Sequence, residues 1–372
     1  MAEPDGAPTP TLLERAGAAE PSLRRSLVGP LPTTPQAALR DLAEATSALP
    51  DEARWDRYGA HGAVAALEER VAVLLGKPAA AMFPSGVMAQ QSMLRVWCDA
   101  NGSRRVAAPS LCHPLRHEDD GPRLLHGLEF EYLTDGPTVP QAEHLRAIPG
   151  RLGAALLELP LRDAGYLLPT WDELVAFSQA CRERGVPLHL DGARIWESAP
   201  YYGRSPAEVA ALADSVYVSF YKGLGGLSGA AVVGPEDEVG EARRWRQRMG
   251  GTLFTLMPYA MAAWRGLDLE LPRMAEYHEH AVLLAGRLAD RGILVSPDPP
   301  HANAFRVHVE REVADLDERR VVVMERDHVR LSPPWFPSVT PGWSWTELVV
   351  GPATVQWPLD EAVETFARVF VD

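Results

Sequence analysis

The sequence has little cysteine and no long apolar run. Its 372 residues include only three cysteines, Cys98, Cys112 and Cys181, and no CxxC pair. A sparse, odd set of thiols excludes a disulfide framework and is typical of a reducing compartment. No stretch approaches the ~18–20 uncharged apolar residues of a membrane span. We therefore expect a cytoplasmic protein with no membrane partner.

Basic residues are outnumbered by acidic ones. The chain has 36 lysines and arginines against 50 aspartates and glutamates, a formal charge of −14. An acidic surface of this size argues against a nucleic-acid partner, although a local pocket can still be basic. No grouping of His, Cys and Asp has zinc-ligand spacing, so we expect no catalytic metal.

The N-terminus lacks the basic start and apolar core of a secretory signal. Its segment MAEPDGAPTPTLLERAGAAEPS is instead rich in proline and alanine. Such a composition buries too little apolar surface to order a chain end. We expect residues 1–25 to form a poorly ordered tail.

Short apolar strands alternate with helical patterns between residues 80 and 235. This alternation predicts an α/β fold with a mostly parallel sheet and helices on both faces. One helix is expected over 170–185, where Thr170 and Glu173 form a capping box. The expected strands are 79–83, 106–109, 128–133, 153–159, 186–193, 214–226 (ending in a glycine-rich turn) and 228–234.

The pattern changes from about residue 270. A long helix over 273–292 is followed by strand patterns in ILVSP, NAFRVHVE, RVVVME and ELVVGPATVQW, and by a closing helix in PLDEAVETFARVFV. Apolar residues make up 46% of the chain, and its length suits one large and one smaller domain. We expect a large α/β domain over 26–268 and a small C-terminal α+β domain over 269–372.

Lys222 follows the apolar strand SVYVSFY and precedes GLGG. Open α/β sheets bind ligands at the carboxyl ends of their strands. Burial there lowers the pKa of a lysine and makes its amine a usable nucleophile toward a carbonyl. The following glycines leave room for a bulky ligand. Taken alone, such a lysine is more often a surface residue at a strand–turn junction.

Asp191, in LHLDGARIW, also ends an apolar strand. A carboxylate in this place can keep a heterocyclic ring nitrogen of a cofactor protonated. Arg194 lies three residues further on and has the forked geometry that binds a substrate carboxylate. A plain Asp turn with an Arg ion pair explains the same residues equally well.

The segment FPSGVMAQQ (83–91) reads as a strand, then Ser-Gly, then a helix. This arrangement presents free backbone N–H groups and a positive helix end, which together bind phosphate. It lacks the GxxxxGK[ST] and GxGxxG patterns of nucleotide sites. A plain helix start is the alternative interpretation.

The three features occur in a telling order: a phosphate cup, a strand-end Asp and, 31 residues later, a strand-end Lys. This order resembles that of fold-type I enzymes that use pyridoxal 5'-phosphate (PLP). More specifically, LHLDGARIW and SFYKGLGGLSGA, with RYGAHGAVAALEERVAVLLGK and FPSGVMAQQ, resemble the threonine aldolase / β-eliminating lyase family. The similarity runs from about residue 54 to 255, and the chain looks like a divergent member.

The resemblance implies roles for three catalytic residues. Lys222 would carry PLP as a Schiff base, and Asp191 would pair with the pyridinium nitrogen. His113, in SLCHPLRHEDDG, matches the family histidine that stacks on the PLP ring. Glu118 aligns with an acidic residue of the family, with no role assigned.

The resemblance also implies the remaining contacts. Ser85, Gly86 and Val87 would hold the cofactor phosphate, with Ser219 as a weaker candidate. Arg194 would contact the cofactor O3' or the substrate carboxylate. These are expectations from the family pattern and not from spacing.

Tyr58 and the subunit arrangement follow from the same comparison. Tyr58 resembles a loop residue that reaches toward the active site, often that of a neighbouring subunit, although a simple turn explains it as well. The resemblance implies a homodimer or homotetramer with active sites near the subunit interface.

The sequence departs from the family on the substrate side. ELPLRDAGY (158–166) stands where aldolases read E-N-T-H-N, and a second family histidine has no counterpart in IPGRLGAALL. Leu253 and Phe254 stand in place of an arginine, and a C-terminal arginine expected to bind the α-carboxylate has no match. We hypothesise that Arg162 replaces a lost carboxylate ligand.

The implied activity is that of a PLP-dependent carbon–carbon lyase. It would cleave the Cα–Cβ bond of a small β-hydroxy-α-amino acid to glycine and an aldehyde, or run in reverse. Other PLP chemistry, namely β-elimination, transaldolation or transamination, is the nearest alternative. A non-catalytic regulator on the same fold is the third.

Overall fold

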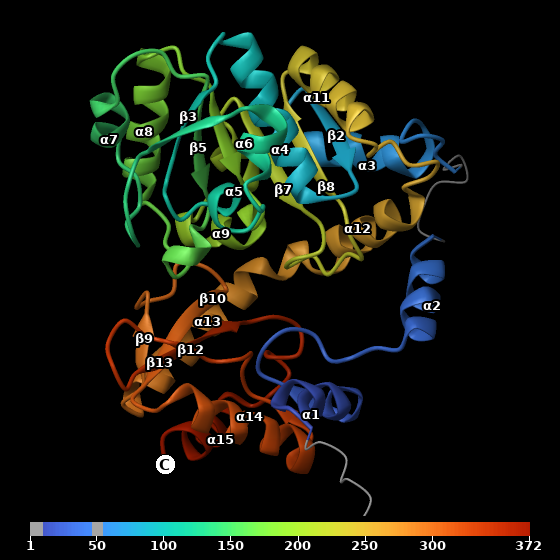
Figure 1. The fold of residues 1–372 in the computed structure, drawn as a ribbon. Coiled ribbons are helices and arrows are strands. Elements are labelled where there is room, and N and C mark those ends of the chain that lie inside the picture. Colours follow the sequence, from blue (N-terminus) through green and yellow to red (C-terminus); the bar gives the residue numbers. More distant parts are fainter. Residues whose placement is uncertain (1–9, 47–54) are drawn as a thin grey trace, which may run out of the picture. The chain divides into compact units, whose positions relative to one another are not determined.

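The structure is a computed structural model that describes residues 10–46 and 55–372. The chain forms two compact units (Figure 1). One comprises Ala38–His278, and the other joins the described residues up to Ala37 with Glu279–Asp372. The expected division at residue 268 therefore differs from the observed one by about ten residues, and the N-terminal segment groups with the C-terminal unit.

The larger unit is built on a seven-stranded sheet in the order β2-β8-β7-β6-β5-β3-β4. The strands from β7 to β4 run parallel, while β8 is antiparallel to both β7 and β2. This is the mostly parallel sheet that the alternating pattern predicted. The strands are β2 Ala79–Phe83, β3 Arg105–Ala108, β4 Glu129–Tyr132, β5 Ala154–Glu158, β6 Leu188–Asp191, β7 Ser215–Ser219 and β8 Ala230–Gly234.

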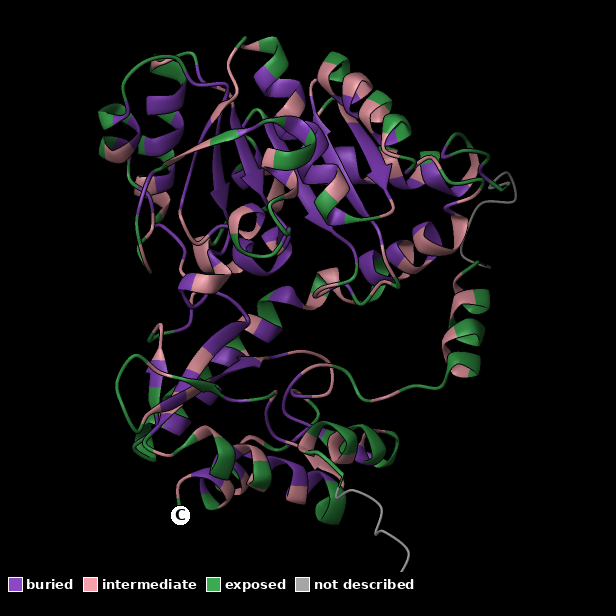
Figure 2. Cartoon of the chain, in the orientation of Figure 1, coloured by how far each residue is buried: buried purple, intermediate pink, exposed green. Residues whose placement is uncertain are grey.

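The central strands are buried on both faces, as Figure 2 shows by their continuous purple. Apolar side chains of α4 and α11 pack with strand residues such as Phe83, Val106 and Leu156 in one core cluster. The helices of the larger unit are α2 Pro35–Thr46, α3 Gly62–Leu74, α4 Gly86–Ala100, α5 His113–Arg116, α6 Gly121–His126, α7 Ala142–Ala147, α8 Trp171–Glu183, α9 Ile195–Tyr202, α10 Pro206–Ala210, α11 Glu236–Arg248 and α12 Met257–Leu269. The first residues of α2 belong to the other unit. The larger unit also contains the 3-10 helices η2 Arg162–Ala164 and η3 Leu271–Arg273.

Local sequence signals set the helix starts. Thr170 Oγ1 accepts the Glu173 N–H at 3.3 Å, and the Glu173 carboxylate accepts the Thr170 N–H at 2.8 Å. This reciprocal pair satisfies two N–H groups that a helix start leaves free, so the predicted capping box of α8 is confirmed.

The smaller unit carries a four-stranded antiparallel sheet in the order β12-β13-β10-β9. The strands of this sheet are β9 Leu294–Ser296, β10 Ala304–Val309, β12 Phe336–Pro337 and β13 Ser344–Val349. The helices of the smaller unit are α1 Leu12–Ala19, α14 Val313–Asp327 and α15 Leu359–Phe370. Helix α13 Met274–Asp290 begins in the larger unit and continues into the smaller one.

The strand predicted in the segment RVVVME is wrong, because this segment lies within α14. Leu316, Arg320 and Met324 recur every four residues and are buried, and this helical spacing outweighs the strand preference of the valines.

The structure also corrects the expected tail. Residues 12–19 form helix α1, which packs on α14 through Ala16, Ala19 and Met324. Arg15 binds Glu318 and Glu325, each at 2.8 Å. The apolar stripe and the ion pairs order a segment whose composition suggested disorder; residues 1–9 lie outside the described part. No helix in the described ranges is long and apolar enough to cross a membrane.

Candidate active site

Three parallel strands bring polar side chains to one edge of the large sheet. Glu158 ends β5 and is the register partner of Asp191, which ends β6. Asp191 is in turn the partner of Tyr217 in β7. Lys222 follows the end of β7 by three residues. The strand order thus places the predicted Asp and Lys on adjacent strands at a carboxyl edge, where such sheets bind ligands.

Lys222 is half-buried, and its surroundings favour the neutral amine. Burial and the charge of Arg194 together lower the pKa of Lys222 to about 8, while Asp191, Glu158 and Glu197 oppose the shift. An amine with this pKa is partly unprotonated near neutral pH. It can therefore act as a nucleophile toward a carbonyl.

Asp191 is only 2% exposed, and its Oδ1 accepts the N–H of Ala193 at 3.1 Å. A Cβ added at the next residue, Gly192, would lie 2.8 Å from the carbonyl oxygen of Tyr217. The strand-end turn is therefore packed closely against β7. This packing holds a buried carboxylate in a fixed position.

His113 begins α5, and its ring is oriented by a buried carboxylate. Its Nδ1 lies 2.9 Å from Oε1 of Glu118, whose Oε2 accepts a hydrogen bond from Gln91 at 2.6 Å. Burial lowers the pKa of His113, but the Glu118 hydrogen bond and the charges of Asp191 and Glu158 outweigh it and raise the pKa overall. The imidazole is thus held beside the strand-end carboxylates and is readily protonated.

Glu158 ties two loops to the sheet edge. Its Oε2 accepts the backbone N–H of His113 at 2.8 Å, and its Oε1 accepts that of Arg162 at 3.2 Å. Burial, together with the neighbouring charge of Asp191, raises the pKa of Glu158 to about 7, although the two N–H donors oppose this. The side chain fixes where both loops begin.

The segment expected to bind phosphate forms the start of α4. Ser85 is the N-cap, and its Oγ accepts the Met88 N–H at 3.3 Å. A Cβ at Gly86 would lie 2.0 Å from the Tyr217 hydroxyl oxygen, so only glycine fits here. Since Tyr217 is the register partner of Asp191, the helix start lies over the same sheet edge. Val87 is 38% exposed, and Ser219 is buried at the end of β7.

The three remaining predicted residues lie in different surroundings. The Arg194 guanidinium stacks over the Tyr166 ring at 5.4 Å from its centroid, at the start of α9 beside Lys222. The Arg162 backbone is bound to Glu158, and its side chain lies 3.6 Å from the Asp163 carboxylate. Tyr58 instead packs edge-on against Phe254, 5.5 Å away between ring centroids.

Comparison with known proteins places this arrangement. The model of the family described as β-eliminating lyase matches residues 32–312, well over half of the chain. The chain belongs to the β-eliminating lyase family. A candidate L-allo-threonine aldolase of Listeria monocytogenes is 34% identical, covers 97% of this chain and 99% of its own, and has a TM-score of 0.89.

Two further relatives also carry threonine aldolase in their names. The low-specificity L-threonine aldolase of Escherichia coli K12 is 29% identical over 285 residues, which cover 74% of this chain and 85% of that protein. A candidate aromatic amino acid β-eliminating lyase/threonine aldolase of Exiguobacterium is 35% identical, covers 96% of this chain and all of its own, and has a TM-score of 0.88. Serine palmitoyltransferase of Sphingomonas wittichii, 15% identical with a TM-score of 0.64 over 89% of this chain and 83% of its own, shares the fold.

Sequence reasoning missed several residues of this family member's site. Glu158 received no role because its partners His113 and Asp191 lie on other segments. Glu118 received none although His113 lies only five residues away. His117 also received no role, and its side chain is 41% exposed; its ring lies 5.2 Å from that of His113, and its Nε2 lies 2.8 Å from Oδ2 of Asp163.

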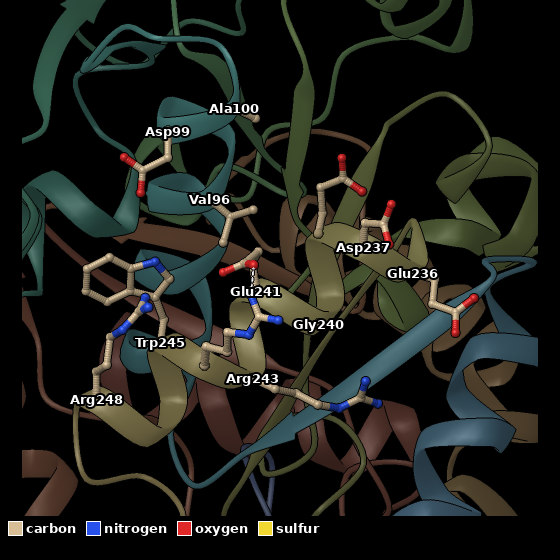
Figure 3. A pocket seen from close by; sticks show the side chains of 12 residues that line it. Val96, Asp99, Ala100, Glu236, Asp237, Gly240, Glu241, Arg243, Trp245 and Arg248 are labelled. Carbon is tan, nitrogen blue, oxygen red and sulfur yellow. Dashed lines mark hydrogen bonds and ion pairs between the residues drawn. The ribbon is translucent and has the colours of Figure 1, made fainter.

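A hollow of about 680 Å³ lies away from these residues, between α4 and α11 (Figure 3). Its wall combines Asp99 and the acidic first turn of α11 with Arg243 and Arg248. The guanidinium groups of Arg95 and Arg248 lie 4.6 and 4.7 Å from the centroid of the Trp245 ring. None of the predicted site residues lines this hollow.

Proposed function

We propose that this chain is a PLP-dependent lyase that cleaves the Cα–Cβ bond of a β-hydroxy-α-amino acid to glycine and an aldehyde, or runs the reverse reaction. One observation carries the proposal. The Lys222 amine, the Asp191 carboxylate and the His113 imidazole meet at one sheet edge in a member of a family whose relatives include threonine aldolases. The low pKa of Lys222 is what a residue that condenses with an aldehyde needs.

The residues at this edge fit PLP. At Gly86 any side chain would collide with Tyr217, so only glycine lets the start of α4 pack directly against this strand of the sheet edge. A helix start offers N–H donors to a phosphate, and the buried carboxylate of Asp191 can hold a protonated ring nitrogen. When bound, PLP supplies an electron sink for the electron pair released from the Cα–Cβ bond.

Each side chain then has a defined task. Lys222 holds the cofactor covalently, and Asp191 keeps its ring nitrogen protonated. Ser85, Gly86 and Val87 bind the phosphate through backbone N–H groups and the Ser85 hydroxyl, with Ser219 at the end of β7 as a second hydroxyl. These donors are rigid because a helix and a central strand carry them.

His113 covers the cofactor ring, and Glu118 fixes the orientation of its imidazole through the 2.9 Å hydrogen bond. His117 is the acceptor for the β-hydroxyl proton, since Asp163 orients its ring and it lies beside His113. A histidine base oriented by a carboxylate is a recurrent catalytic arrangement.

The substrate carboxylate is bound by arginine. Arg194 lies next to Lys222, and its planar fork matches a carboxylate. Arg162 is anchored at its backbone by Glu158 and can supply a second cation from the β5 side.

Tyr58 supports assembly into a homodimer or homotetramer. Tyr58 and Phe254 form an aromatic pair that is 59% and 61% exposed, which is an unusual amount of aromatic surface to leave in water. A second copy covering this pair would bring Tyr58 to the rim of a neighbouring active site. The three cysteines are free and buried, which suits a reducing compartment such as the cytoplasm.

Product analysis tests the proposed function. Purified protein loaded with PLP is incubated with a panel of β-hydroxy amino acids, and aldehyde, glycine, keto acid and ammonia are quantified. Equal amounts of aldehyde and glycine are expected. Keto acid with ammonia would assign β-elimination instead, and no product together with no PLP binding would favour a regulator on this fold.

A further inference from the structure

Glu197 is a buried carboxylate that the proposed reaction leaves unused. It lies in the first turn of α9, three residues after Arg194, and is only 1% exposed. Its Oε1 accepts the backbone N–H of Gly223 at 3.1 Å, and Gly223 directly follows Lys222. Its Oε2 is shut off from solvent and has no hydrogen-bond partner in the described part of the chain. A half-satisfied buried carboxylate is costly, so the Gly223 N–H and the nearby charges of Arg194 and Lys222 have to offset its burial.

The contact with Gly223 is close enough to restrict the sequence. A Cβ at Gly223 would lie 2.2 Å from Oε1 of Glu197. Any other residue at position 223 would therefore push the carboxylate away or move the Lys222 segment. The glycine after Lys222 is explained by this carboxylate and does not depend on a ligand.

The charges around Glu197 favour an interaction with Lys222. Burial raises the pKa of Glu197, while Arg194, Lys222 and the Gly223 N–H oppose the rise. The other acidic groups that act on Lys222 are Asp191 and Glu158. Glu158 already accepts two backbone N–H groups, and Asp191 is assigned to the cofactor ring.

We propose that Glu197 is a positioning residue for Lys222. Its Oε1 fixes the peptide that follows the lysine, and its buried negative charge favours the ammonium form of the lysine side chain. The inference rests on the proposed function, because it assigns Lys222 to PLP. Glu197 ties the peptide that follows Lys222 to helix α9. Without this contact, Lys222 would be held only by its connection to the end of β7.

Cofactor capture by the apoenzyme tests this role without an activity assay. The rate of PLP association is measured by stopped-flow absorbance across pH for the wild type, Glu197→Gln and the surface control Glu183→Gln. Capture needs the neutral amine, so its pH midpoint reports the pKa of Lys222. Glutamine keeps an acceptor for the Gly223 N–H but removes the negative charge that favours the ammonium.

The Glu197→Gln midpoint is expected about one pH unit below that of the wild type, so that capture is faster at low pH. Glu183→Gln is expected to match the wild type, since Glu183 is exposed on α8. Coincident midpoints for the wild type and Glu197→Gln would overturn the proposal.

Gly223→Ala probes the other half of the contact. Its methyl group displaces the carboxylate, so capture is expected to be slower at every pH while circular dichroism shows a folded chain. Unchanged capture in this variant would overturn the anchoring role. A wild type that does not bind PLP at all would instead refute the proposed function, which separates the two failures.

Discussion

Replacing Glu158 with glutamine is expected to change the stability of the apoenzyme by an amount that depends strongly on pH. Glu158 is buried beside Asp191, and burial raises its pKa from 4.5 to about 7 in the folded chain. Between these values the folded state binds more protons than the unfolded state. The free energy of unfolding therefore falls as pH rises through this window.

The magnitude follows from the two pKa values. Each pKa unit corresponds to about 1.4 kcal/mol, so the shift of Glu158 removes about 3.5 kcal/mol from the free energy of unfolding as pH rises from well below 4.5 to above about 7. Glutamine does not titrate, but it has only one oxygen that can accept a hydrogen bond. Its NH2 group therefore faces the backbone N–H of either His113 or Arg162, and that N–H loses its acceptor. Leaving that buried N–H unpaired costs about 1–3 kcal/mol.

Urea unfolding of the apoenzyme at about pH 5 and about pH 8 tests this. Glu158→Gln is expected to be less stable than the wild type at the lower pH by about 1–3 kcal/mol. At the higher pH it is expected to be at least as stable. A difference that grows with pH would mean that the two N–H donors outweigh burial and hold Glu158 ionised, which would refute the reasoning.

Three further variants test individual contacts of the site. Gly86→Ala is expected to weaken PLP binding at least about tenfold, measured by equilibrium titration, because its methyl group meets the Tyr217 hydroxyl; Tyr217→Phe in the same chain should restore part of the affinity. Arg162→Ala is expected to raise KM about tenfold or more while the absorbance of bound PLP is unchanged, and an unchanged KM would exclude it as a carboxylate ligand. His117→Gln is expected to lower kcat about 100-fold with PLP binding intact, and Asp163→Asn to lower it less; normal turnover in the first variant would remove His117 as the base.

The sequence predicted those parts of the fold that local patterns encode. Lys222 and Asp191 were found because apolar strands end in a polar residue and glycine, and the start of α8 because Thr170 and Glu173 form a capping box. The sheet edge then brought Lys222 and Asp191 together, as parallel strands do.

The missed residues depend on pairings between distant segments. Glu158 acquires its role only when β5 and β6 align it with Asp191 and the His113 loop returns to it. Glu197 lies 26 residues from the backbone N–H that it binds. Helix α1 was missed because its stability comes from α14, more than 290 residues away, and not from its own composition.

Covalent attachment of PLP to Lys222 is the central claim, and it can be measured directly. Borohydride reduction of the PLP-loaded protein, followed by digestion and mass spectrometry, shows which lysine carries the cofactor. The chain has only one other lysine, Lys77, whose Nζ donates to the carbonyl oxygen of Ala213. We predict that the modified peptide contains Lys222 and that Lys222→Ala abolishes the modification. A label on Lys77, or none on either lysine after loading with PLP, would contradict the account.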